Sequence, residues 1–98
     1  MRYIITENRL RQFINSFIDN WTSTKLRYLY FDNILYMDTE DEGYCVMEYD
    51  PSDGRLWFSK RLKHDLQNIF NLSQEEIYKI MKEWFEAHND VEVAFVES

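Results

Sequence analysis

Hydrophobic positions near the N-terminus recur at steps of three and four residues. The residues with this spacing are Leu10, Phe13, Ile14, Phe17, Ile18 and Trp21. Such a stripe predicts an amphipathic helix, which we expect to end near Asp19 and Asn20. Before it, residues 2–5 (RYII) predict a short strand. Thr6 is a suitable N-cap, because its hydroxyl can accept a hydrogen bond from an amide of the first turn.

The hydrophobic period changes to two between residues 26 and 59. Turn residues divide this stretch into LRYLYFDNILYMD (26–38), YCVMEYD (44–50) and RLWFSK (55–60). These segments predict a three-stranded antiparallel meander, which follows a connection at residues 20–25. The first strand is long, so we expect a bend or bulge near Asp32 and Asn33. The Pro-Ser-Asp-Gly segment 51–54 predicts the second turn, because proline fixes φ and glycine tolerates φ > 0.

The registers of the two turns assign residues to the faces of this meander. If Met37 lies opposite Cys45, and Asp50 lies opposite Arg55, one face collects mainly aliphatic and aromatic side chains. They are Phe31, Leu35, Met37, Cys45, Met47, Tyr49, Leu56 and Phe58. We expect this face to meet the core. The opposite face then carries Tyr28, Tyr30, Ile34, Tyr36, Tyr44, Val46 and Trp57.

Two further helices and a last strand complete the expected fold. Helical spacing of hydrophobic residues covers 60–71 and 73–88, and Ser73 with Glu76 has the spacing of a capping box. The alternating segment 91–96 predicts a closing strand. We therefore expect one α+β domain over residues 1–98. Its antiparallel sheet would consist of the central meander plus terminal strands, with three amphipathic helices on one face.

Charge and composition narrow the classes of function. The net charge of −7 disfavours nucleic acid as a partner, because phosphate binding needs clustered Lys and Arg. Residues 32–53 hold eight acidic and no basic side chains, whereas residues 54–64 hold four basic and no acidic ones. The first 31 residues are also basic, so folding can bring two basic blocks together. No apolar run is long enough for a signal peptide or a membrane span, and the single cysteine fits a reducing compartment. We expect a cytoplasmic protein.

The acidic segment before Gly43 resembles the start of a calcium loop. Its carboxylates belong to Asp38, Glu40, Asp41 and Glu42. An EF-hand also needs a bidentate Glu at its twelfth position and flanking helices, but here that position is Tyr49 and both flanks have the period of strands. We interpret the segment as a solvated acidic turn. A weak divalent cation site of another type is the alternative.

Other residues with reactive side chains do not form a catalytic pattern. Cys45 follows the acidic turn, where nearby carboxylates raise the pKa of its thiol, and it is predicted to face the core. His64 and His88 lie far apart without the spacing of metal ligands. With two glycines in the chain, a glycine-rich phosphate loop is excluded. The sequence thus predicts no catalytic residue, no resident metal and no cofactor.

The first 14 residues, MRYIITENRLRQFI, resemble the opening of many small proteins from marine tailed phages. Those proteins often begin with a basic residue, an Ile-rich strand, Thr-Glu and a helix. The resemblance implies no activity. The chain also has only two glycines and one proline beside many Ile, Asn, Tyr, Phe and Lys residues, a bias typical of an AT-rich genome. Both observations suggest a phage or a low-GC bacterium, and if the gene belongs to a phage, the protein would act in the cytoplasm of its host.

The aromatic face predicts an interaction surface. Its candidate residues are Tyr28, Tyr30, Tyr36 and Trp57, because large rings with polar tips are common at interfaces. We expect a non-enzymatic module that binds a protein partner or itself, most simply as a two-fold homodimer. One alternative is an acidic inhibitor or nucleic-acid mimic that uses the acidic turn together with Glu48, Asp50 and Asp53. Another is a small enzyme without a recognisable motif.

Overall fold

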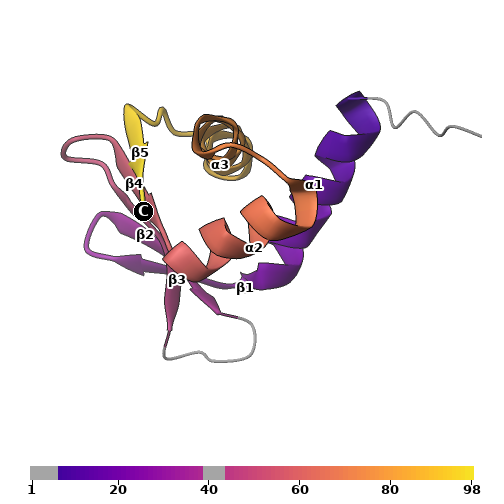
Figure 1. Cartoon of the computed structure of the whole chain (residues 1–98). Helices are drawn as coiled ribbons and strands as arrows, with labels where there is room; N and C mark the ends of the chain where they lie inside the picture. The colour runs from indigo at the N-terminus through magenta and orange to yellow at the C-terminus, as the bar shows by residue number, and fades with distance from the viewer. Residues whose placement is uncertain (1–6, 39–43) are drawn as a thin grey trace, which may run out of the picture.

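The computed structural model describes residues 7–38 and 44–98, and at residues 7, 8 and 23–28 we consider the backbone alone. The elements follow the order α1 (Glu7–Trp21), β1 (Thr22–Tyr30), β2 (Asn33–Asp38), β3 (Cys45–Asp50), β4 (Arg55–Phe58), α2 (Lys60–Phe70), α3 (Gln74–Asn89) and β5 (Phe95–Glu97) (Figure 1). The strands form one sheet in sequence order, antiparallel from β1 to β4 and parallel between β4 and β5. The α+β class is confirmed. The predicted strand at 2–5 and the N-cap at Thr6 lie outside the described residues.

Residues 26–38 form a hairpin, so the prediction of one bent strand is wrong. Tyr30 pairs with Asn33, and the two residues between them make a tight turn. β1 begins at Thr22, directly after α1, where the Thr22 hydroxyl donates a hydrogen bond of 3.0 Å to the Ile18 carbonyl. Residues 22–25, which were predicted to be a connection, therefore belong to a strand. The antiparallel meander has four strands instead of three.

β3 contains one extra residue, which changes the face assignment of β2. Met37 pairs with Cys45 as predicted, but Tyr36 pairs with Met47, so Val46 has no partner on β2. Such a bulge places two consecutive residues of one strand opposite one residue of its neighbour. As a result, Tyr36 joins Met47 on the core face. Leu35 and Met37, which we predicted to be in the core, lie on the opposite face with intermediate exposure.

The predicted register of the second hairpin is confirmed. Asp50 pairs with Arg55, Met47 with Phe58 and Tyr49 with Leu56, which places Met47, Tyr49, Leu56 and Phe58 on one face as predicted. Phe31, in contrast, was predicted to share that face, but its side chain is 86% exposed. The prediction for Phe31 fails because it assumed uninterrupted alternation through the turn of the first hairpin.

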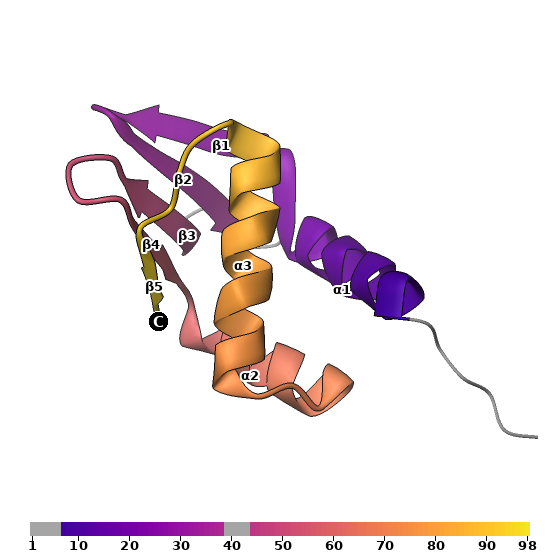
Figure 2. The same ribbon diagram turned by 90° about the horizontal axis from the view of Figure 1, so that it is seen from above.

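One hydrophobic cluster joins the core face of the sheet to all three helices. It includes Ile14 and Ile18 from α1, Leu62 and Leu66 from α2, and Ile77, Ile80, Met81, Trp84 and Phe85 from α3. Figure 2 shows α3 lying across the sheet. The Tyr36 ring meets the edges of Trp84 and Phe85, with ring centroids 5.4 and 5.9 Å apart. Truncating a buried aromatic ring of this kind to alanine costs about 3–5 kcal/mol.

Polar contacts fix α1 and the helix ends. The Trp84 indole donates a hydrogen bond of 2.9 Å to Asp19, and an ion pair joins Arg11 to Glu83, so both contacts connect α1 to α3. The capping box predicted at Ser73 is confirmed. The N-cap of α2 is the buried Ser59, whose hydroxyl accepts a hydrogen bond of 3.1 Å from the Leu62 amide.

Gly54 connects the β3–β4 turn to the last strand. Its φ is +73°, as the turn prediction requires, and its carbonyl accepts a hydrogen bond of 2.8 Å from the Ala94 amide. A Cβ atom at this position would lie 2.7 Å from the Ala94 Cβ. β5 then runs beside β4 from Phe95 to Glu97 and is shorter than the predicted strand 91–96. The glycine is required both by its φ angle and by the close approach of Ala94.

We predict that Gly54→Ala lowers the free energy of unfolding by about 2 kcal/mol, since it adds left-handed backbone strain and a clash. Urea unfolding measures this loss. The double variant Gly54→Ala/Ala94→Gly should be less destabilised relative to Ala94→Gly alone, because the clash is removed while the strain stays. Equal stability of Gly54→Ala and the wild type would contradict the described turn.

Candidate protein-binding surface

The structure does not bring the four predicted interface residues together. Tyr36 is only 1% exposed, so its assignment to an interface is wrong. Its hydroxyl lies 3.3 Å from Asn89 Oδ1, to which it donates, and 3.1 Å from Asn89 Nδ2, from which it accepts. The ring of Tyr36 lies in the core because the unpaired Val46 shifts the pairing between β3 and β2 by one residue. This shift exchanges the two faces of β2 relative to the prediction.

The other three predicted residues have different positions. The side chain of Tyr28 is outside the described part of the chain, although its backbone pairs with Leu35. Trp57 has intermediate exposure and pairs with Glu48 on the face opposite the core. Tyr30 is 62% exposed, but it lies at the end of β1, next to the hairpin turn. Of the four, Tyr30 alone has a described side chain that is mostly accessible.

The face opposite the core carries a charge network around Arg55. Its guanidinium lies 3.2 Å from a Glu97 carboxylate oxygen and 4.0 Å from one of Glu48. These three charged residues line a hollow with a volume of about 320 Å³, together with Cys45 and Trp57. This part of the sheet is therefore occupied by paired charges and does not present the continuous aromatic surface that we predicted.

Cys45 lies on this open face, so the prediction that it faces the core is wrong. Its thiol donates a hydrogen bond of 3.2 Å to the Met47 carbonyl. Partial burial raises the pKa of the Cys45 thiol, and the Glu48 carboxylate raises this pKa further. The direction agrees with the sequence-based expectation, but the main cause is burial. A thiol that stays protonated is a poor nucleophile.

Among the described side chains of the sheet and its turns, the most exposed apolar ones lie at the tip of the β1–β2 hairpin. Leu29, Tyr30 and Phe31 are 66%, 62% and 86% exposed, and we call them the hairpin tip. The rings of Tyr30 and Phe31 meet edge to face at 4.7 Å. Phe31 has a φ of +53°, a left-handed conformation that is rare for a bulky side chain. The tip therefore combines apolar exposure with local backbone strain.

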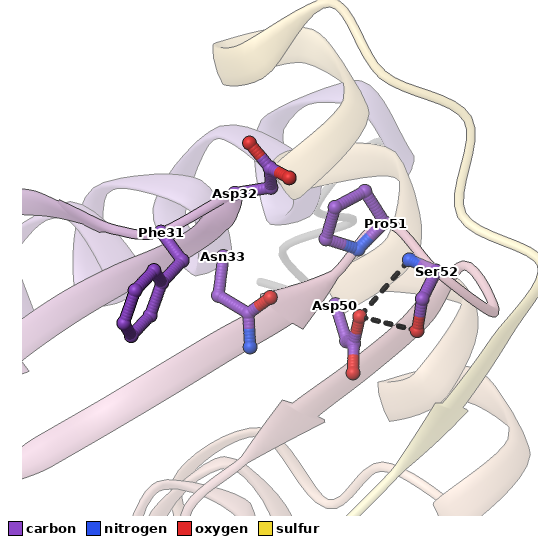
Figure 3. Close-up of a pocket in the computed structure, with 6 residues that line it drawn as sticks. All are labelled: Phe31, Asp32, Asn33, Asp50, Pro51 and Ser52. Atoms are coloured by element: carbon purple, nitrogen blue, oxygen red, sulfur yellow. Dashed lines mark hydrogen bonds between the residues drawn. The ribbon is translucent and has the colours of Figure 1, made fainter.

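A hollow with a volume of about 590 Å³ lies beside the hairpin tip, between the ends of two hairpins. Its lining residues are Phe31, Asp32, Asn33, Asp50, Pro51 and Ser52. In Figure 3, Asn33 and Asp50 point to one side of the hairpins, and Asp32 points to the other. We call this hollow, together with the adjacent exposed Asp53, the acidic hollow.

Asp50 is held as an anion within the acidic hollow. The amide and the hydroxyl of Ser52 donate hydrogen bonds of 2.9 and 2.7 Å to Asp50 Oδ1. These hydrogen bonds, together with the charge of Arg55, hold the pKa of the Asp50 carboxyl below its ordinary value. The hollow thus keeps a negative charge even in mildly acidic solution.

Of the four carboxylates in the predicted acidic turn, only that of Asp38 belongs to a described residue. Asp38 is only 8% exposed, and its amide donates a hydrogen bond of 2.8 Å to the Tyr44 carbonyl. Glu40, Asp41 and Glu42 lie outside the described residues. Asp38 pairs with the buried Thr22, at the end of the sheet opposite the β1–β2 turn.

Leu29, Phe31 and Asp32 were missed as surface candidates. Asp32 and Asn33 stand between two alternating segments, a combination typical of a hairpin turn. A turn at these residues predicts that the adjacent Phe31 is exposed instead of buried in the core. Among the described residues, no group of three or more His, Cys, Asp or Glu side chains is placed to hold a metal ion. Within the same ranges, no helix is long and apolar enough to cross a membrane.

We predict that Phe31→Gly is more stable than Phe31→Ala by about 1 kcal/mol, measured by urea unfolding. Both variants lose the exposed ring, so their difference isolates the strain of the left-handed backbone. A lower stability for the glycine variant than for the alanine variant would show that Phe31 is unstrained.

We further predict that the Cys45 thiol titrates above the ordinary pKa of a cysteine, measured by the pH dependence of its alkylation rate. Because the folded pKa is raised, the thiol stabilises the fold fully below its unfolded pKa, and this stabilisation is lost as the pH rises through the folded pKa. Glu48→Gln should lower the thiol pKa, and Lys79→Gln on α3 is the control. A pKa below that of an unfolded cysteine would contradict the described environment.

Comparison with known proteins adds no relative to these observations. No protein-family model, curated protein or solved structure shows significant similarity to this chain. The hairpin tip and the acidic hollow lie side by side at one end of the sheet. Their chemistry suits recognition: large rings provide apolar contact area, and fixed carboxylates provide charge selectivity.

Proposed function

We propose that this chain is a small non-enzymatic module that binds a protein partner through the hairpin tip. The observation that carries the proposal is Phe31, which is 86% exposed in a left-handed conformation at φ +53°. The exposed ring buries little surface, so it contributes little to folding. The two-residue turn requires a left-handed backbone at this position, but glycine or asparagine would adopt it at lower cost than phenylalanine. An exposed ring at a position that disfavours it is a reason to propose a function there.

The residues around the tip suggest the chemistry of the partner. Three apolar side chains extend from the tip, Asp32 and Asp50 line the hollow beside it, and the exposed Asp53 lies in the same turn as Ser52. A complementary surface would offer an apolar or aromatic pocket to the rings and would border it with Lys or Arg. We therefore propose a partner with a basic-rimmed aromatic pocket.

The alternatives have less support. An acidic mimic of nucleic acid needs a broad array of free carboxylates, but Asp38 is buried and Glu48 faces Arg55. A small enzyme would need a catalytic group, and the raised pKa of Cys45 disfavours a nucleophilic role for this thiol. The lone cysteine and the resemblance of the first 14 residues support a site of action in the cytoplasm of a low-GC bacterium or of an infected host.

We predict that the double variant Tyr30→Ser/Phe31→Gly captures its partner at least ~10-fold less than the wild type, because exposed rings at an interface centre commonly contribute 2 kcal/mol or more. Each chain is used as bait in extracts of the native host or of infected cells, and retained proteins are quantified by mass spectrometry.

The matched control is Phe13→Ser, which changes an apolar side chain of α1 that is 58% exposed. This variant should retain the partner. Far-UV circular dichroism checks that all variants are folded. The proposal is wrong if the tip variant and the wild type capture the same proteins in equal amounts.

A further inference from the structure

A third hollow on this chain has a chemistry opposite to that of the acidic hollow. It has a volume of about 450 Å³ and is lined by Trp21, Lys60, Arg61, His64 and Asp65. Trp21 is the last residue of α1, and the others lie in the first turns of α2. We call it the basic hollow. It offers an indole ring and three basic side chains against one carboxylate.

The charges of the basic hollow are poorly compensated within the described part of the chain. The first turn of α2 contains no acidic residue, although the positive end of a helix dipole favours anions and disfavours cations. Lys60 and Arg61 are exposed, and the guanidinium of Arg61 lies 5.4 Å from the centre of the Tyr44 ring. No ion pair joins either side chain to a carboxylate of a described residue. Carboxylates from another molecule would relieve this repulsion.

The acidic hollow and the basic hollow lie at opposite ends of the sheet. Tyr30 pairs with Asn33, and Asp50 pairs with Arg55, so the hairpin tip and the acidic hollow share one end. β4 runs away from that end and leads through Ser59 into α2, which begins at the basic hollow. Figure 2 shows this separation: the β1–β2 turn and the start of α2 lie at different ends of the strands.

We infer that the hairpin tip of one copy docks into the basic hollow of a second copy. The inference rests on the proposed function, because it identifies the basic-rimmed aromatic pocket of the partner with a pocket on this same chain. The rings of Tyr30 and Phe31 would pack on Trp21 and on the aliphatic stems of the cationic side chains. The carboxylates of the acidic hollow would then face the cationic side chains of Lys60 and Arg61 and the ring of His64.

This contact differs from the two-fold dimer predicted from the sequence. A contact between two different surfaces is heterologous, and it extends to open chains or closes into rings. Each added copy presents a fresh tip at one end and a fresh basic hollow at the other. The assembly therefore grows with concentration instead of stopping at two copies.

Complementary variants test the inference by sedimentation velocity from micromolar to millimolar concentration. The tip variant is Tyr30→Ser/Phe31→Gly, and the hollow variant is Lys60→Glu/Arg61→Glu. The wild type should form species heavier than a dimer, and each variant alone should lose all species heavier than the monomer. An equimolar mixture should form a 1:1 heterodimer and nothing larger, because it contains one intact tip and one intact hollow for each pair.

Two controls separate this contact from general effects of charge and folding. Lys79→Glu/Lys82→Glu changes the net charge by the same amount on α3 and should leave the assembly unchanged. Phe31→Gly alone keeps all charges and should still reduce assembly. Circular dichroism and thermal unfolding confirm that each variant is folded.

Three results would overturn the inference: a wild type that stays monomeric throughout, a hollow variant that still assembles, or a mixture of variants that forms no heterodimer. If the wild type stays monomeric but the tip variant still loses a captured protein, the proposed function stands and the partner is a different protein. If the tip variant changes neither assembly nor capture, both proposals fail.

Discussion

An extra residue in β3 decides which side of β2 faces the helices. Side chains of a strand alternate between two faces, so a shift of one residue moves a whole set from the core to solvent. Val46 introduces this shift, since Met37 pairs with Cys45 whereas Tyr36 pairs with Met47. The ring of Tyr36 then lies against Trp84 and Phe85, with its hydroxyl satisfied by Asn89, and α3 is seated on the sheet through these contacts.

The same strand pairing determines which side chains of the sheet stay exposed on the surface. With Tyr36 in the core and Arg55 paired with Glu48 and Glu97, the described side chains of the open face offer little free aromatic surface. Among these described side chains of the sheet and its turns, apolar exposure is highest where β1 turns into β2. There Phe31 is exposed to solvent with a left-handed backbone, and the proposed binding surface rests on this combination.

The strongly periodic parts of the fold could be predicted from the sequence. Helical stripes located the three helices, Ser73 marked the start of α3, and Pro51 with Gly54 set the register of the second hairpin. The bulge could not be predicted, because an alternating segment looks the same with or without an unpaired residue such as Val46. Asp32 and Asn33 are typical turn residues. The alternation of hydrophobic residues on both sides of them nevertheless favoured the prediction of one long strand. Of the four predicted interface residues, only Tyr30 lies on the proposed surface. Tyr36 is buried on the other face of β2, and the side chain of Tyr28 is outside the described residues. Trp57 is on the open face as predicted, but it is partly buried beside the charges around Arg55.

The register of β2 is most directly tested by nuclear Overhauser effects between side chains in solution. The described fold predicts contacts between the ring protons of Tyr36 and those of Trp84 and Phe85, whose centroids lie 5.4 and 5.9 Å from the Tyr36 centroid. Uninterrupted alternation would instead place the methyl groups of Leu35 against Phe85. Contacts from Leu35 to Phe85, without contacts from Tyr36, would contradict the account.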